Sequence, residues 1–173
     1  QMCIRDRRQG ERRRDEALQT FRTGLLLHGL LGLTLICIGI LLNSGPVNSA
    51  IADPGIRTVF TEFFAIRLLG FIPFTALLAF NALYTGTAKT WPILAIGVCS
   101  ATINIVLDAA WVEGWWGVEA IGATGAAWAS FCAESTGFLI ALALTFWVMP
   151  EALRPWSLPV SYTHLTLPTM ELV

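Results

Sequence analysis

Four long apolar segments constrain this chain more than any other feature of its sequence. A helix needs about 20 apolar residues to cross the roughly 30 Å hydrocarbon core of a bilayer, and each segment reaches that length. Membrane β-strands alternate apolar and polar residues over about ten positions, and these segments do not. The sequence therefore predicts an all-α membrane protein with four transmembrane helices. They are expected at about residues 23–42, 58–84, 91–112 and 121–148.

Composition also favours a membrane protein. Of the 173 residues, 55% are hydrophobic and 13% are charged, whereas soluble domains carry about 25% charged residues. The Lys and Arg residues are concentrated near the N-terminus, between Arg5 and Arg22. On an apolar chain such a cluster is typical of a cytoplasmic anchor rather than of a nucleic-acid-binding arm. We therefore expect the lipid bilayer, and no nucleic acid, as a partner.

The same basic residues predict the orientation, because cytoplasmic loops carry an excess of Lys and Arg. The surroundings of Arg13 and Lys89 are expected in the cytoplasm, and Asn48 and Gly117 outside. Arg57 is the one basic residue that falls in an outer loop. The breaks between the segments carry the Gly, Pro, Asn and Asp residues that turns favour. These breaks lie at residues 43–46, 53–55, 85–87 and 113–114.

Both ends of the chain resemble translated sequencing adapter. Residues 1–6 match the translation of a transposon end, and residues 160–169 match that of its complement with the adjoining adapter. We expect residues 1–7 and 159–173 to be adapter-derived and not part of the natural fold. The natural segment is then residues 8–158, and the remainder of a longer parent chain is expected to be its partner.

The third apolar segment contains the strongest functional signal. Asn104 and Asp108 are four residues apart, so they share one face of a helix, one turn from each other. A carboxylate in a membrane helix costs about 2.5–3.5 kcal/mol on insertion scales and persists where it faces a cavity or a partner. An amide and a carboxylate at this spacing suit a hard cation such as Na⁺, or a proton. The other interpretation is a hydrated carboxylate at the outer interface, near Glu113.

The fourth segment combines small residues with two polar ones. Small residues recur at every fourth position from Gly125 to Gly137, which lets helix backbones approach closely in lipid. Ser130 and Glu134, also four residues apart, could direct oxygens at Asp108 across the helical hairpin. For Glu134 two interpretations stay open. It is either a functional carboxylate lining a cavity or a neutral, hydrogen-bonded carboxylic acid.

Two residues of the second segment are further candidates for lining a cavity. Pro73 removes a backbone hydrogen bond and is expected to kink its helix, either as a static bend or as a hinge. Arg67 can extend to the outer interface or pair with Glu62. His28, alone on an apolar helix, is expected to be packed and hydrogen-bonded rather than a ligand.

Catalytic motifs are absent from the sequence. It contains no nucleophile elbow, no His and Cys cluster with metal-ligand spacing and no Gly-rich phosphate loop after a strand. We expect neither an enzyme nor an organic cofactor.

In their order and spacing these motifs resemble the multidrug and toxic compound extrusion (MATE) family of transporters. The resemblance covers nearly all of residues 10–150, as helices three to six of the N-terminal lobe. It implies a twelve-helix protein of the bacterial inner membrane that exports organic cations or drugs in exchange for Na⁺ or H⁺. The stretches that carry it are Gly86-Thr87-Ala88-Lys89-Thr90, Asn104-Ile105-Val106-Leu107-Asp108 and Gly122-Ala123-Thr124-Gly125-Ala126-Ala127-Trp128-Ala129-Ser130.

The resemblance also implies a cation site. In the family, an asparagine and an aspartate of the fifth helix and a hydroxyl of the sixth bind the coupling ion. Carried over to this chain, these residues are Asn104, Asp108 and Ser130, with Asn104 and Asp108 as Na⁺ ligands. The family's first-helix aspartate has no counterpart here.

Two other functions stay open at this stage. A lipid-linked oligosaccharide flippase of a related fold would line its cavity with more Arg and Lys than the single Arg67. A membrane interaction protein without transport activity would not need a polar face with Asn104 and Asp108.

Overall fold

The computed structural model describes the backbone of residues 2–149 and the side chains of residues 18–149 except Pro46. This part of the chain is helical and contains no strand. Its elements are α1 (Met2–Ser44), α2 (Pro46–Ala50), α3 (Pro54–Gly86), α4 (Trp91–Trp111), the 3₁₀ turn η1 (Trp115–Gly117) and α5 (Gly122–Val148). Four helical stretches are long and apolar enough to cross a membrane, which confirms the predicted all-α membrane class.

The first helix begins earlier than predicted. α1 starts at Met2, whereas the apolar segment starts at residue 23. The charged stretch before residue 23 is rich in Arg and also carries Gln and Glu, which favour a helix without adding hydropathy. The backbone of residues 2–7, predicted to be adapter-derived, belongs to this helix. The other predicted adapter segment, residues 159–173, lies outside the described residues.

The start of α3 is set by a cap rather than by hydropathy. The Asp53 carboxylate accepts hydrogen bonds from the backbone N–H groups of Gly55, at 2.7 Å, and Ile56, at 3.0 Å. Pro54 occupies the first helical position, where its missing N–H costs nothing. The predicted break at residues 53–55 is therefore the first turn of the helix, and α3 begins four residues before the predicted position.

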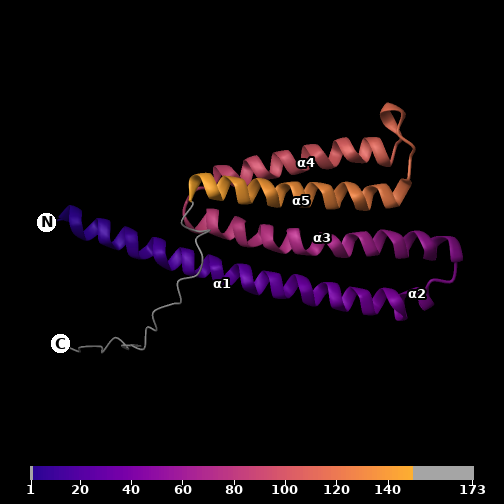
Figure 1. The fold of residues 1–173 in the computed structure, drawn as a ribbon, viewed down its shortest axis with the longest axis horizontal. Coiled ribbons are helices and arrows are strands. Elements are labelled where there is room, and N and C mark those ends of the chain that lie inside the picture. Colours follow the sequence, from indigo (N-terminus) through magenta and orange to yellow (C-terminus); the bar gives the residue numbers. More distant parts are fainter. Residues whose placement is uncertain (1, 150–173) are drawn as a thin grey trace, which may run out of the picture.

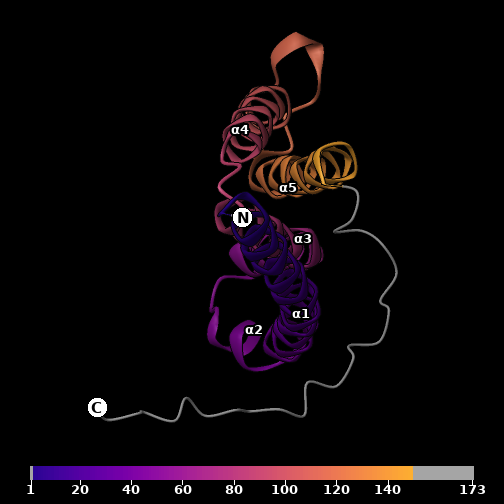
Figure 2. The same cartoon turned by 90° about the vertical axis from the view of Figure 1, so that its left-hand side faces the viewer.

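The four long helices pack in the order α1, α3, α5, α4 (Figure 1). α5 lies between α3 and α4, and the view along the helices shows the same order (Figure 2). α3 and α5 run in the same direction, and α4 runs opposite to both (Figure 1). α5 is consequently the helix that shares one face with α3 and another with α4.

The best-packed region lies where α3 and α5 end and α4 begins. Tyr84 and Phe80 of α3 are fully buried there, against Ala141 of α5 and Phe21 of α1. The rings of Phe21 and Phe80 have centroids 5.2 Å apart. Elsewhere many large apolar side chains are exposed, for example Leu94 at 71% and Phe146 at 70%. Such surfaces on long apolar helices suit lipid rather than water.

Candidate functional site

A row of polar side chains on α4 faces α5. Ser100, Asn104 and Asp108 follow one another at intervals of four residues and therefore lie on one side of the helix. A side chain at Gly137 of α5 would clash with Ser100 Oγ, and a Cβ at Gly125 would lie 2.7 Å from the carbonyl oxygen of Trp111. These two close approaches bracket the row, so Asn104 and Asp108 lie along the contact with α5.

Asn104 and Asp108 each carry a buried polar atom without a partner. Among the described residues, Asn104 Nδ2 and Asp108 Oδ1 are inaccessible to solvent and have no hydrogen bond. The α5 side chains at this level are small, and Ala129 is fully buried. Buried polar atoms in native proteins are normally paired, so these two atoms call for a ligand, a water molecule or another polar group.

Ser100 joins this row, and the sequence analysis missed it. Its Oγ is also buried and without a hydrogen bond in the described part of the chain. The signal was present, because Ser100 precedes Asn104 by four residues, as Asn104 precedes Asp108. Serine is common enough in membrane helices that the spacing alone did not single it out.

Ser130 is not bonded to Asn104 or Asp108. It is half-buried on α5, and none of the hydrogen bonds within residues 18–149 joins it to either residue. It lies one turn before Glu134, which meets α3, and two turns before Gly137, which packs against Ser100 of α4. The structure therefore brings Asn104 and Asp108 together but does not connect Ser130 to them.

Glu134 and Arg67 form an ion pair that the sequence did not predict. Glu134 could have directed its oxygens at Asp108, but its Oε1 lies 2.8 Å from Arg67 Nη2 on α3. Arg67 was expected to reach the interface or Glu62. Glu62 instead lies 3.5 Å from the Thr124 hydroxyl. The physical reason is the parallel packing of α3 and α5, which brings the Glu134 carboxylate of α5 to the Arg67 guanidinium of α3.

The ion pair is largely removed from solvent. The exposed fractions of the Arg67 and Glu134 side chains are 28% and 19%. Arg67 Nη1 and Glu134 Oε2 are buried and have no hydrogen-bond partner in the described region. Glu134 Oε2 rests against Gly70, where a Cβ would overlap it. Gly70 thus provides the space in which the carboxylate meets the guanidinium.

The remaining sequence candidates have structural positions. Pro73 is buried inside α3, and the helix continues through it as a single element. His28 Nδ1 lies 2.7 Å from the carbonyl oxygen of Gly24, one turn earlier in α1. This contact confirms that His28, which is half-buried, is hydrogen-bonded.

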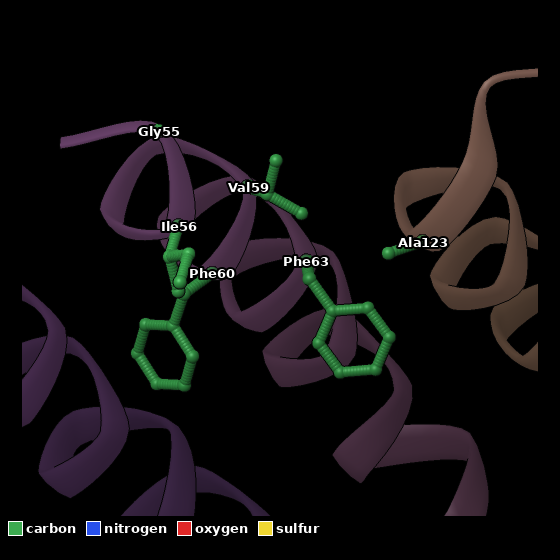
Figure 3. Close-up of a pocket in the computed structure, with 6 residues that line it drawn as sticks. All are labelled: Gly55, Ile56, Val59, Phe60, Phe63 and Ala123. Carbon is green, nitrogen blue, oxygen red and sulfur yellow. The ribbon is translucent and has the colours of Figure 1, made fainter. Parts of the chain in front are cut away.

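A separate apolar hollow of about 410 Å³ lies at the start of α3, beside the start of α5 (Figure 3). All of its lining residues are apolar, so it offers no ligand to an ion and is distinct from the Asn104 and Asp108 pair. They are Gly55, Ile56, Val59, Phe60, Phe63 and Ala123.

The described residues contain no group of three or more His, Cys, Asp and Glu side chains that could hold a metal ion. Asn104 and Asp108 carry fewer oxygens than a hard cation takes, so a cation beside Asp108 would need further oxygen ligands. Ser100 Oγ, on the same face of α4, is one that this chain offers.

Comparison with known families decides the class of the protein. A family model described as MatE matches residues 7–110, which include α3 and nearly all of α4. The chain belongs to the MatE family. Comparisons with curated proteins and with solved structures give no match.

Membership of MatE makes the chain a membrane-embedded protein of a transporter family, which agrees with its four apolar helices. It is also consistent with the expected absence of enzyme activity. The MatE match includes Arg67, Asn104 and Asp108, whereas Ser130 and Glu134 lie beyond its last residue, 110. The Asn104 and Asp108 pair therefore lies inside the part of the chain that the family model matches.

Proposed function

We propose that this chain is part of a secondary active exporter that exchanges organic cations or drugs for Na⁺ or H⁺ across the bacterial inner membrane. The observation that carries the proposal is the pair formed by Asn104 and Asp108. Asp108 Oδ1 is buried in a membrane helix without a partner, one turn from Asn104, whose amide nitrogen is also unpartnered and whose amide oxygen is the atom that would face a cation. Family membership supports transport in general, and this pair supports a cation as the coupling species.

The chemistry follows from the cost of an isolated charge. A carboxylate in the membrane is costly unless a cation, a proton or a polar group compensates it. A cation bound at Asp108 stabilises one conformation of the transporter over another by the difference between its affinities for the two. When the cation is released on the other side of the membrane, the transporter returns to the first conformation. By resemblance to the family, the four helices act as helices three to six of a lobe in a twelve-helix protein.

The flippase alternative requires free positive charge for an anionic phosphate headgroup. Arg67, the residue on which that alternative depends, is neutralised by Glu134 at 2.8 Å. A paired guanidinium is a weak attractor for a phosphate, so this contact favours a cation exporter.

The test replaces the charge of Asp108 in the complete transporter. Asp108→Asn keeps the size and most of the hydrogen bonding of the side chain but removes the charge that a cation would bind. We expect drug export to be lost while expression and membrane insertion are retained. The matched control is Glu113→Gln, which neutralises an exposed carboxylate just beyond the end of α4 and should leave export unchanged. Native export by Asp108→Asn, with unchanged Na⁺ and pH dependence, would refute the proposal.

A further inference from the structure

The contact between α3 and α5 contains two opposite charges inside membrane-spanning helices. Arg67 lies 13 residues after the start of α3 at Pro54, and Glu134 lies 12 residues after the start of α5 at Gly122. Their nearest atoms, Arg67 Nη2 and Glu134 Oε1, are 2.8 Å apart. A charge at such a position is costly, and pairing is one of the few ways to keep it.

Glu134 and Asp108 lie at different contacts of α5, and within the described residues only Glu134 has a positively charged partner. Glu134 faces α3, where Arg67 is the charged residue in contact with it. Asp108 of α4 lies along the opposite contact of α5, and its Oδ1 has no hydrogen-bond partner in the described region. The two carboxylates are therefore separated by a helix, one with a built-in counter-ion and the other without.

We propose that Arg67 is a tethered counter-ion that occupies the position beside Glu134 which a mobile cation would otherwise take. Arg67 thereby restricts cation binding to the Asp108 side of α5 and is a specificity-determining residue. Cation binding at Asp108 rests on the function proposed above, whereas the role of Arg67 as the counter-ion of Glu134 does not.

The guanidinium suits this role because it keeps its charge under all ordinary conditions. Unlike Na⁺ or a proton, it is covalently held and cannot be released to either side of the membrane. Its monodentate contact leaves Glu134 Oε2 free, against the bare backbone of Gly70. If the guanidinium is removed, Glu134 Oε1 faces the space that it had filled.

We therefore expect that removing the Arg67 guanidinium alone increases, rather than decreases, the number of cations that the protein binds. In Arg67→Gln, Glu134 stays in a region where an isolated carboxylate is strongly disfavoured. It should then acquire a proton or a Na⁺ ion in place of the guanidinium. We expect the variant to hold one more cation per protein than the wild type, as bound Na⁺ or as a protonated carboxyl group.

The experiment counts both species on the purified protein in lipid nanodiscs. Binding of radioactive Na⁺ gives the number of bound ions, and infrared difference spectroscopy detects a newly protonated carboxyl group. The control Arg67→Gln/Glu134→Gln removes both charges and should return the count to the wild-type value. Asp108→Asn in the Arg67→Gln background should leave the gain unchanged, which separates this inference from the function proposed for Asp108.

The inference is wrong if folded Arg67→Gln gains neither Na⁺ nor a protonated carboxyl group. If Arg67→Gln is unstable, the inference requires that Na⁺ or lower pH raise its melting temperature, because a ligand of the folded state stabilises it. If Arg67→Gln stayed unfolded with added Na⁺ and at lower pH while the double variant folded, no cation would be replacing the guanidinium and the inference would be wrong. Failure of the double variant as well would assign the pair to folding alone and would equally overturn the inference.

Discussion

The hydroxyl group of Tyr84 on α3 donates a hydrogen bond of 3.0 Å to the carbonyl oxygen of Ala141 on α5. Both residues are fully buried, and the Tyr84 oxygen also lies 2.7 Å from the Thr145 hydroxyl. This bond joins the two parallel helices at the end opposite to Glu62 and Thr124. It fixes how far α5 extends along α3, and hence which residue of α5 lies beside Arg67.

Tyr84→Phe should lower the free energy of unfolding by about 1 kcal/mol, the net value of one hydrogen bond. Thr145 keeps its own bond of 2.7 Å to the Ala141 carbonyl oxygen, so no polar atom loses every partner. Tyr84→Ala also removes a buried ring and should cost roughly 3–5 kcal/mol. Thermal unfolding in nanodiscs measures both. Equal losses for the two variants would show that the hydroxyl, and not the packing of the ring, dominates.

The close approach of α4 and α5 predicts a graded response to alanine. At Gly125, a Cβ would lie 2.7 Å from the Trp111 carbonyl oxygen, and the backbone cannot move aside without separating the helices. We expect Gly125→Ala to destabilise by about 1–3 kcal/mol, the usual cost of overpacking. Gly97 has no atom within 4 Å of an added Cβ. Gly97→Ala should therefore be neutral or stabilising, by up to about 1 kcal/mol, and a larger loss there than at Gly125 would contradict the packing.

The helix positions could be predicted because their signals are local. The segment predicted at residues 91–112 corresponds to α4 at Trp91–Trp111, and that at 121–148 to α5 at Gly122–Val148. Apolar composition and the Glu113-Gly114 break each act over a few residues. The spacing of Asn104 and Asp108 on one helical face is local in the same sense.

The partner of Arg67 could not be predicted, because it depends on how helices pack. Glu134 is 67 residues away in the sequence, on a helix that contacts α3 only because α5 lies between α3 and α4. Periodicity shows which residues share a face, as with Ser130 and Glu134, but not which helix that face meets. The sequence therefore left open that Glu134 faces α4, the other helix of the hairpin, whereas it meets α3.

The topology predicted from the basic residues has a direct test. Lys89 Nζ donates to the carbonyl oxygen of Val148 at 3.2 Å, so the α3–α4 loop and the end of α5 lie on one side of the membrane. After all four cysteines are replaced, Thr90→Cys and Glu119→Cys place single thiols at exposed positions of the two loops. An impermeant maleimide on intact cells should label position 119 and not position 90. Labelling of position 90 alone would reverse the orientation.

The relative effects of substitutions along the polar face of α4 provide the sharpest test of the cation site. Asp108→Asn removes the charge and should abolish coupling, whereas Asn104→Ala removes a neutral ligand and leaves the carboxylate in place. The loss of one buried polar partner is worth roughly 1–3 kcal/mol, so Asn104→Ala should weaken cation affinity about 5- to 150-fold. The control is Thr102→Val, because the Thr102 side chain is exposed and its hydroxyl bonds only to the carbonyl oxygen of Val98 in the preceding turn.

The order expected for the apparent Na⁺ or H⁺ affinity of export is that Thr102→Val equals the wild type, Asn104→Ala is weaker, and Asp108→Asn shows no coupled transport. The assay measures export by the complete transporter at several Na⁺ concentrations and pH values. If Asn104→Ala kept the wild-type cation affinity, Asn104 would not be a ligand and Asp108 would bind the cation without it. A variant of Thr102 that weakens affinity as much as Asn104→Ala would show that the effect comes from α4 packing and not from the face that carries Asn104 and Asp108.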